Sequence, residues 1–192
     1  MNFNQKIIIN AHVERQSWIT SLCKDKTVID VGFNDTGMDG NSLHNNIKKV
    51  AKRVVGIDNT IDKSYTGESY KVDLNGASLM TPPDRLRGFD ILVAGEVIEH
   101  LVNPSGLFAY IIGSKAREVI ITAPNAFAPH RFNENRLTGD VFEEIVHPEH
   151  FSWYSLFTLK RIVEDQLSPR YTIQEVVLID NQNSIGIHLI KL

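Results

Sequence analysis

A short apolar run that ends in glycine constrains this chain more than any other feature. The stretch Lys26–Gly37 reads KTVIDVGFNDTG, in which the β-branched segment Thr27–Val31 is followed by Gly32 and, five residues later, by Gly37. Continuous apolar character is typical of a parallel strand that is covered on both faces. Glycine directly after such a strand lets the backbone turn sharply and approach a ligand that a side chain would exclude. The segment therefore predicts a loop that binds a nucleotide-type cofactor.

Strand and helix patterns alternate along most of the sequence, which predicts an α/β fold. Helical spacing precedes the first strand and recurs between later ones. Suitable helix starts are Asn41 or Ser42, the pair Asn103-Pro104, and Ser155. We expect a doubly wound, mostly parallel seven-stranded sheet with an antiparallel closing hairpin. The expected strands are Thr27–Val31, Arg53–Asp58, Ser69–Leu74, Phe89–Gly95, Glu118–Ala123, Tyr171–Asp180 and Ser184–Leu192.

The chain of 192 residues is expected to form a single domain, 1–192. Apolar spacing before the first strand predicts an N-terminal helix over residues 3–23. Residues 125–153 have no strong periodicity, and long loops in compact domains are usually functional. We therefore expect 125–153 to be a lid or a loop that binds the acceptor.

Polar residues follow the carboxyl ends of the expected strands. Carboxyl ends of parallel strands meet at one edge of a sheet, and ligands of open α/β sheets bind in the crevice there. We therefore expect the following residues to share one site: Asp30, Asp58, Asp73, Glu96, His100 and Asn125.

The spacing around the glycine loop indicates a cofactor that contains adenosine. The loop resembles the dinucleotide-binding fingerprint, with Asn34 at the position of the middle glycine. Asp58 follows Gly37 at about the 20-residue distance expected of a carboxylate that accepts hydrogen bonds from ribose hydroxyls. This pattern does not separate a nicotinamide dinucleotide from another adenosine cofactor.

A set of motifs resembles class I S-adenosylmethionine-dependent methyltransferases, and the resemblance extends over almost the whole chain. The segment FDILVAGEVIEHL, Phe89–Leu101, closely matches the subgroup that methylates quinones and other small molecules. His147–Ser155 resembles members often found alongside enzymes of surface-polysaccharide assembly. The resemblance implies a Rossmann-like methyltransferase fold and S-adenosyl-L-methionine as the cofactor. The remaining motifs are Val28–Gly32, Val55–Asp58, Val72–Leu74 and Ile120–Asn125.

The same resemblance implies which residues bind each part of the cofactor. The methionine part is expected to contact Asp30, Gly32, Phe33 and Asn34. The ribose is expected to contact Asp58 and Asn59, and the adenine is expected to contact Asp73 and Leu74. The sulfonium is expected to lie beside Ala94, Gly95 and Glu96. Members of the family usually have glycine at Asn34 and near Thr36. Because asparagine tolerates the left-handed backbone conformation better than most residues, the turn is expected to form, with the Asn34 side chain crowding the cofactor.

Methyl transfer from a sulfonium to a hydroxyl requires alignment of the two groups and removal of the hydroxyl proton. His100 and His150 are the candidate catalytic residues, because an imidazole can titrate near neutral pH. A structural role stays open for His100 and for His150. It also stays open for His147, which lies on the same loop as His150. Glu96, Glu99 and His100 also admit a divalent metal, although we expect none.

Composition restricts the class of partner. The net charge is −3 and 22% of the residues are charged, which gives no reason to expect nucleic acid or an anionic membrane as partner. The sequence has a lone cysteine, Cys23, no run near the roughly 20 apolar residues of a membrane span, and no signal-peptide pattern at its start. We expect a cytoplasmic protein, and the sequence carries no signal for an oligomeric state.

The sequence thus predicts an S-adenosylmethionine-dependent methyltransferase with a small-molecule substrate. The expected reaction is O-methylation of a sugar or a sugar-linked intermediate of surface polysaccharide. Two alternatives stay open. One is a methyltransferase-like binding or regulatory module without catalytic activity, which Asn34 and Thr36 suggest, and the other is an NAD-dependent oxidoreductase.

Overall fold

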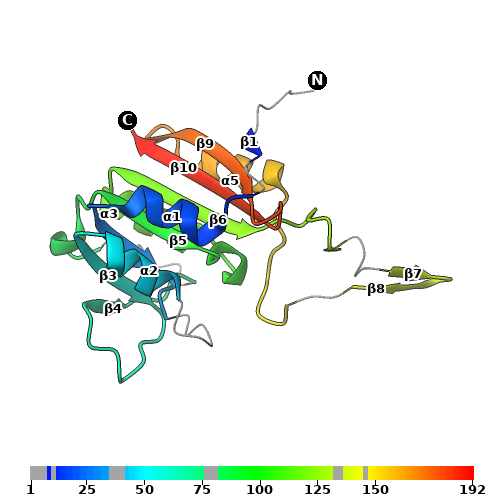
Figure 1. The fold of residues 1–192 in the computed structure, drawn as a ribbon, viewed down its shortest axis with the longest axis horizontal. Coiled ribbons are helices and arrows are strands. Elements are labelled where there is room, and N and C mark those ends of the chain that lie inside the picture. Colours follow the sequence, from blue (N-terminus) through cyan, green and yellow to red (C-terminus); the bar gives the residue numbers. More distant parts are fainter. Residues whose placement is uncertain (1–7, 10–11, 35–41, 76–81, 132–135, 145–146) are drawn as a thin grey trace.

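The centre of the molecule is a mixed sheet (Figure 1). The computed structural model describes residues 8–9, 12–34, 42–75, 82–131, 136–144 and 147–192. The sheet has 8 strands in the order β1-β9-β10-β6-β5-β2-β3-β4. Their bounds are β1 (Ile8–Ile9), β2 (Thr27–Val31), β3 (Arg53–Asp58), β4 (Ser69–Lys71), β5 (Ile91–Gly95), β6 (Glu118–Pro124), β9 (Tyr171–Ile179) and β10 (Ser184–Lys191).

The predicted fold class is confirmed, and β1 adds an eighth strand to the seven expected ones. β4, β3, β2, β5 and β6 pair with one another in parallel, whereas β10 is antiparallel to both β6 and β9. The chain crosses over after β3 and β4 from one side of β2 to the other, so the strand order reverses between β2 and β5. A doubly wound sheet binds ligands at such a reversal. The closing hairpin β9–β10 turns through 180–183, where Asp180, Asn181 and Gln182 have positive φ.

The expected N-terminal helix over 3–23 is wrong in its extent. Ile8 and Ile9 form β1, which pairs in parallel with Val177 and Leu178 at the edge of the sheet. The helix α1 begins only at Arg15 and ends at Cys23. The predicted helix begins too early in the chain. A short segment with isoleucines can fit a helical pattern of apolar residues and still pair with an open strand edge.

Helices cover both faces of the sheet (Figure 1). α1 and α2 (Leu43–Val50) pack on one face, and α3 (Ser105–Ser114) and α5 (Leu156–Leu167) pack on the other. As predicted, Ser42 caps α2 by accepting a hydrogen bond from the backbone of Asn45, and Ser155 begins α5 in a capping box with Thr158. Two 3-10 turns, η1 (Asp84–Leu86) and η2 (Ile98–His100), complete the helical elements described here. Within the described ranges, the helices are too short or too polar to span a membrane.

Two predicted strands are shorter than expected by more than one residue, because aspartates end or precede them. β4 ends at Lys71 instead of Leu74, and Asp73 accepts a hydrogen bond from the backbone of Asn75 in the turn that follows. β5 begins at Ile91 instead of Phe89. The residue before it, Asp90, accepts hydrogen bonds from the backbone and side chain of Thr27. Strand ends thus depend on side-chain contacts that a hydrophobic pattern does not contain.

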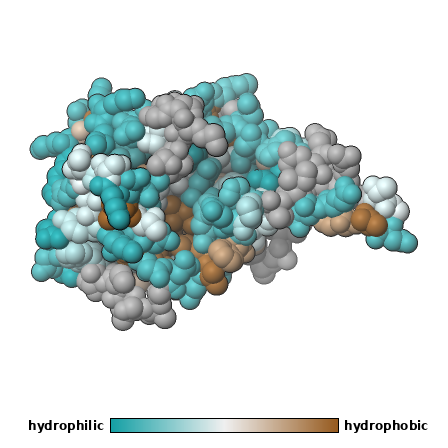
Figure 2. All heavy atoms as spheres, turned by 90° about the horizontal axis from the view of Figure 1, so that it is seen from below, coloured by the Kyte–Doolittle hydropathy of each residue, from teal (hydrophilic) through white to brown (hydrophobic). Residues whose placement is uncertain are grey.

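The segment 125–153 contains a small hairpin that periodicity does not predict. β7 (Arg136–Thr138) pairs in antiparallel fashion with β8 (Val141–Glu143), and the turn between them includes Gly139 at φ 62°. Figure 1 shows this hairpin projecting from the sheet, and Figure 2 shows hydrophobic atoms at the projecting end. Val141 and Phe142 are exposed there.

Candidate functional site

A cleft of about 1040 Å³ lies at the carboxyl ends of the parallel strands, where the site was expected. Its walls come from the segments that directly follow β2, β3, β4 and β5, together with Arg15 and residues 147–151. Ala94 is buried inside β5 and Asn125 binds the backbone of Gln182, and neither lines the cleft. The predicted site residues that line it are Asp30, Gly32, Phe33, Asn34, Asp58, Asn59, Asp73, Leu74, Gly95, Glu96, His100 and His150.

Gly32 makes the sharp turn after β2. Its φ is +74°, in the left-handed region that glycine adopts without steric cost. A Cβ at this position would lie 2.5 Å from Cγ2 of Val97. The backbone N–H of Gly32 donates to the carbonyl oxygen of Ile57 at 2.8 Å, which joins the loop to β3. The cleft therefore requires glycine here for two independent reasons.

Asn34 does not have the left-handed conformation expected of it. It is absent from the described residues that have positive φ, and its side-chain amide lies 3.4 Å from Oγ1 of Thr60. Its backbone N–H donates to Oδ2 of Asp58 at 3.1 Å. Gly32 alone makes the turn among the residues described, so Asn34 needs no unusual geometry. Thr36 and Gly37, on which the sequence prediction also depended, lie outside the described residues.

Asp30 belongs to a buried network that the sequence prediction missed. Oδ2 of Asp30 lies 2.7 Å from Nδ1 of His44, and Nε2 of His44 lies 2.7 Å from the hydroxyl of Tyr65. The ring of Phe33 packs against both His44 and Tyr65, at centroid distances of 4.9 and 4.8 Å. Burial raises the pKa of Asp30, and the hydrogen bond from His44 opposes that shift. The one available signal was the place of His44 in the first turn of the helix after the glycine loop.

Glu96 lies at the floor of the cleft in a strained backbone conformation. Its φ is +55°, which is unfavourable for a residue with a side chain. Oε1 of Glu96 lies 3.3 Å from Nε of Arg15 in α1 and 3.1 Å from the hydroxyl of Ser184 in β10. Strained residues of this kind concentrate at functional sites. The ion pair with Glu96 also explains how α1 contributes Arg15 to the cleft.

Asp58 and Asp73 present carboxylates at neighbouring strand ends. Oδ1 of Asp58 accepts a hydrogen bond from the backbone of Thr60 at 3.0 Å, and Oδ1 of Asp73 accepts one from the backbone of Asn75 at 2.9 Å. Leu74 is buried next to Asp73. An ionised carboxylate has about four acceptor positions, so both groups keep capacity for ligand hydroxyl or amino groups.

Three histidines gather in one part of the cleft, next to a buried acid. The rings of His100 and His150 lie 4.7 Å apart, and His147 stacks on His150 at 4.5 Å. Glu99 is 1% exposed, and burial raises its pKa to about 8. Burial, followed by the neighbouring His100, lowers the pKa of His150 to about 4. The sequence prediction considered Glu99 only as a ligand of a metal that was not expected, and so did not select it as a site residue.

The arrangement separates two kinds of chemistry in one cleft. Carboxylates and backbone amides at the ends of β2, β3 and β4 are suited to binding a nucleoside. Imidazoles and a buried carboxyl on η2 and the loop before α5 are suited to moving a proton or holding a cation.

Comparisons with known proteins identify a fold. No protein-family model and no curated protein matches the sequence. Among solved structures, a SAM-dependent methyltransferase from Aquifex aeolicus is similar with a TM-score of 0.58 and 17% identity, covering 94% of this chain and 91% of that one. The N-methyltransferase NodS from Bradyrhizobium japonicum WM9, solved with S-adenosyl-L-homocysteine, has a TM-score of 0.56 and 11% identity, covering 92% and 85%.

A third similar structure comes from a protein of Rhodobacter sphaeroides that was assigned as a Zn-dependent alcohol dehydrogenase. Its TM-score is 0.61 at 13% identity, covering 97% of this chain and 93% of that one. Identities this low show a shared fold and no more. The antiparallel β10 between β6 and β9 fits the closing hairpin expected of the methyltransferase sheet. The chain therefore has a Rossmann-like fold shared with solved SAM-dependent methyltransferases.

Proposed function

We propose that this protein is an S-adenosylmethionine-dependent methyltransferase that acts on a hydroxyl of a small molecule. The observation that carries the proposal is the cleft itself: Asp30, Gly32, Asp58 and Asp73 surround one cavity at the reversal of a methyltransferase-type sheet. A nucleoside cofactor requires acceptors for its ribose hydroxyls and a glycine turn beside its tail, and both are found at these positions.

The proposed cofactor orientation follows the order of the strands. Asp58, with Asn59 beside it, accepts the ribose hydroxyls from the end of β3. Asp73 and Leu74 bind the adenine after β4, and Asp30 and Gly32 face the methionine part after β2. This orientation directs the sulfonium towards Gly95 and Glu96 and hence towards the histidines, because β5 lies on the other side of β2 from β3.

The proposed acceptor binds between the cofactor and the loop 125–153. In the transfer, the acceptor oxygen forms a bond to the methyl carbon while the sulfur–carbon bond breaks and its electron pair stays on sulfur. The hydroxyl proton passes to water, and S-adenosylhomocysteine remains. His100 and His150 are the groups that face this end of the cleft. A sugar or a sugar-linked intermediate is the proposed acceptor class, because His147–Ser155 resembles methyltransferases often found alongside enzymes of surface-polysaccharide assembly.

Calorimetry with S-adenosylmethionine and S-adenosylhomocysteine tests the proposal directly. We expect both to bind the full chain with one site. NAD is the comparison ligand, and binding of NAD without binding of either sulfur compound would support the oxidoreductase instead. Cofactor binding without turnover on any of a panel of hydroxyl acceptors would favour the inactive module. The negative φ of Asn34 and its contact with Thr60 remove one reason for that alternative.

Asp58→Ala is expected to weaken binding of S-adenosylhomocysteine by roughly 10- to 150-fold. The reason is that a carboxylate that accepts hydrogen bonds from a ligand contributes about 1.5–3 kcal/mol. The measurement is the calorimetric Kd, with circular dichroism to verify the fold.

Asp62→Ala is the matched control for this variant. Asp62 is another carboxylate on the connection between β3 and β4, and it accepts hydrogen bonds from Ser64 outside the cleft. The Kd of Asp62→Ala for S-adenosylhomocysteine should equal that of the unmodified protein. Equal Kd values for Asp58→Ala and Asp62→Ala would contradict the ribose-binding role of Asp58.

A further inference from the structure

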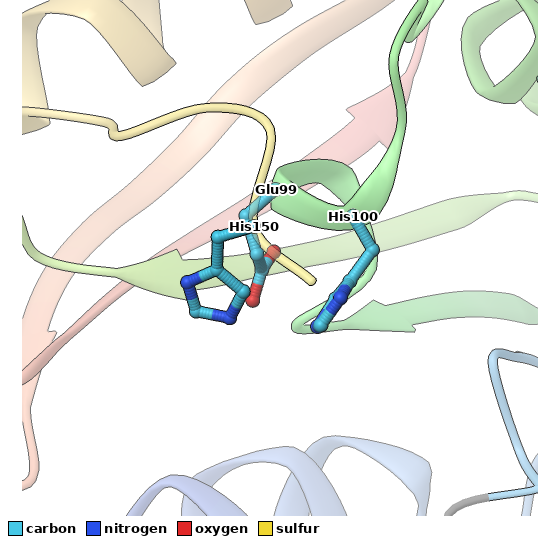
Figure 3. A group of neighbouring side chains, drawn as sticks. All are labelled: Glu99, His100 and His150. Carbon is cyan, nitrogen blue, oxygen red and sulfur yellow. The ribbon is translucent and has the colours of Figure 1, made fainter. Parts of the chain in front are cut away.

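Three side chains that can bind a metal converge at the histidine end of the cleft (Figure 3). Glu99 and His100 are consecutive residues of η2, and His150 comes from the loop before α5. One ligand atom from each lies within 4.8 Å of the others. Atoms that bind one ion at 2.0–2.2 Å lie at most about 4.4 Å apart. Small side-chain rotations therefore bring all three groups to ion-binding distance.

Glu99 has the environment of a ligand without its ion. Its side chain is buried, and neither Oε1 nor Oε2 has a hydrogen-bond partner among the described residues. Nδ1 of His150, which is also buried, has none within the same part of the chain. A buried carboxyl without a partner costs free energy, and structures retain such groups when they have a function. A cation between Glu99 and the two imidazoles satisfies these atoms together.

Hydrogen bonds around the three side chains hold them in place. Nδ1 of His100 lies 3.2 Å from the carbonyl oxygen of Glu149, which leaves Nε2 available to a ligand. Histidines that bind metals usually donate the second ring N–H to such an acceptor. The backbone N–H groups of Phe151 and Ser152 donate to the carbonyl oxygen of Glu99, at 2.8 and 3.3 Å, and so fix the loop with His150 against η2.

Glu96, the other acid of this motif, has different partners. It contacts Arg15 and Ser184, and it does not belong to the described group of converging ligand atoms. The structure thus separates two glutamates that the sequence motif presents together. Glu99 is the one that shares its surroundings with His100 and His150.

We propose that Glu99, His100 and His150 form a binding site for a divalent first-row transition ion such as Mn²⁺ or Co²⁺. Two imidazoles and one carboxylate favour such ions over Mg²⁺, which prefers ligands that are all oxygen. Three protein ligands leave coordination positions open, as in catalytic metal sites. His147 stacks on His150 at the outer side of the site and belongs to the same wall of the cleft.

The site also defines how the acceptor is held, an inference that rests on the proposed function. The ligand residues line the same cleft as Asp58 and Gly32, so the open positions face the space for the acceptor. The acceptor is then a molecule that presents hydroxyl oxygen to the ion. A bound ion supplies Lewis acidity, which lowers the pKa of a ligated hydroxyl so that its proton passes to solvent. His100 and His150 then act as ligands, and neither is a free base.

Mn²⁺ binding to the full chain, measured by calorimetry and electron paramagnetic resonance after treatment with EDTA, tests the site without cofactor or acceptor. We expect one Mn²⁺ per chain and weaker binding of Mg²⁺. Glu99→Gln and His150→Gln should each weaken Mn²⁺ binding by at least about tenfold, because each removes a ligand. His130→Gln is the matched control. His130 is a histidine of the same loop that lies outside the cleft and contacts Asn183, and its replacement should leave the affinity unchanged.

Thermal unfolding separates loss of the ion from loss of the fold. In EDTA, Glu99→Gln should unfold at the same temperature as the unmodified protein or at a higher one, because glutamine replaces an unpartnered carboxyl with a neutral group of the same shape. Only the unmodified protein and His130→Gln should gain stability from Mn²⁺. If Glu99→Gln does not fold, His150→Gln decides the result.

Absence of Mn²⁺ binding to the unmodified protein, or equal affinity of the ligand variants and His130→Gln, would overturn the metal site. Binding of S-adenosylhomocysteine is measured separately on the same samples. A protein that binds Mn²⁺ but neither sulfur compound retains the metal site and loses the proposed methyltransferase function. A protein that binds S-adenosylhomocysteine but not Mn²⁺ retains the proposed methyltransferase function and contradicts the metal site.

Discussion

Gly32→Ala is expected to weaken binding of S-adenosylhomocysteine by at least about tenfold, or 1.4 kcal/mol. The new Cβ would lie 2.5 Å from Cγ2 of Val97, so either Val97 or the loop after β2 must move. Both line the cleft. In addition, a left-handed residue with a side chain costs about 1–2 kcal/mol, which lowers the free energy of unfolding. Calorimetry measures the first effect and urea denaturation the second.

Gly88→Ala provides a control with the same backbone conformation. Gly88 also has a φ of +74°, but a Cβ there would have no atom within 4 Å. This variant should therefore lose a similar free energy of unfolding, about 1–2 kcal/mol, and keep its affinity for S-adenosylhomocysteine. If both alanine variants bind the ligand equally well, the steric role of Gly32 in the cleft is wrong.

Asp30→Ala is expected to lower the free energy of unfolding by about 3–5 kcal/mol, the usual cost of removing one partner of a buried pair. Asp30 and His44 have side chains that are each 3% exposed, and their closest atoms are 2.7 Å apart. Without the carboxylate, Nδ1 of His44 loses its buried partner. The His44 ring, against which Phe33 and Tyr65 pack, is then no longer held in one orientation by Asp30. Denaturation in urea, followed by circular dichroism, measures the loss.

The exposed pair Arg53–Glu68 gives the matching comparison. Glu68 also accepts charged hydrogen bonds, but the two side chains are 46% and 36% exposed. Water and salt screen such pairs, so Glu68→Ala should cost no more than about 1 kcal/mol. Losses of equal size for Asp30→Ala and Glu68→Ala would show that the buried network around His44 does not stabilise the fold.

Much of the fold is predictable because its signals are local. Continuous apolar runs mark β2, β3, β5 and β6, and residues such as Ser42 and Ser155 mark helix starts by accepting hydrogen bonds from backbone a few residues away. The alternation of these elements restricts the sheet to few topologies, since crossover connections have one handedness and short strands pair with neighbours. The same reasoning places Asp30, Asp58 and Asp73 at one edge of the sheet, where the cleft is found.

Other features could not be predicted, because they depend on contacts between distant segments. β1 forms only because β9 offers an open edge to Ile8 and Ile9. His44 appears in the sequence as an ordinary helical residue, and its role follows from the position of α2 beside Asp30 and Tyr65. The projecting hairpin β7–β8 has no strong periodicity to reveal it.

The histidine end of the cleft shows most clearly which features the sequence predicts and which depend on contacts between distant segments. The motif with Glu96, Glu99 and His100 is readable in the sequence, and so is the alternation that places it after the fourth parallel strand. Local pattern cannot decide which glutamate turns towards Arg15 and which is buried beside His150, because that choice depends on how a distant loop packs against η2. Periodicity and turn residues report the order of elements along the chain. The partners of a buried polar group are selected by packing across it, and here that packing leaves Glu99 beside two imidazoles at the end of a cleft suited to a nucleoside.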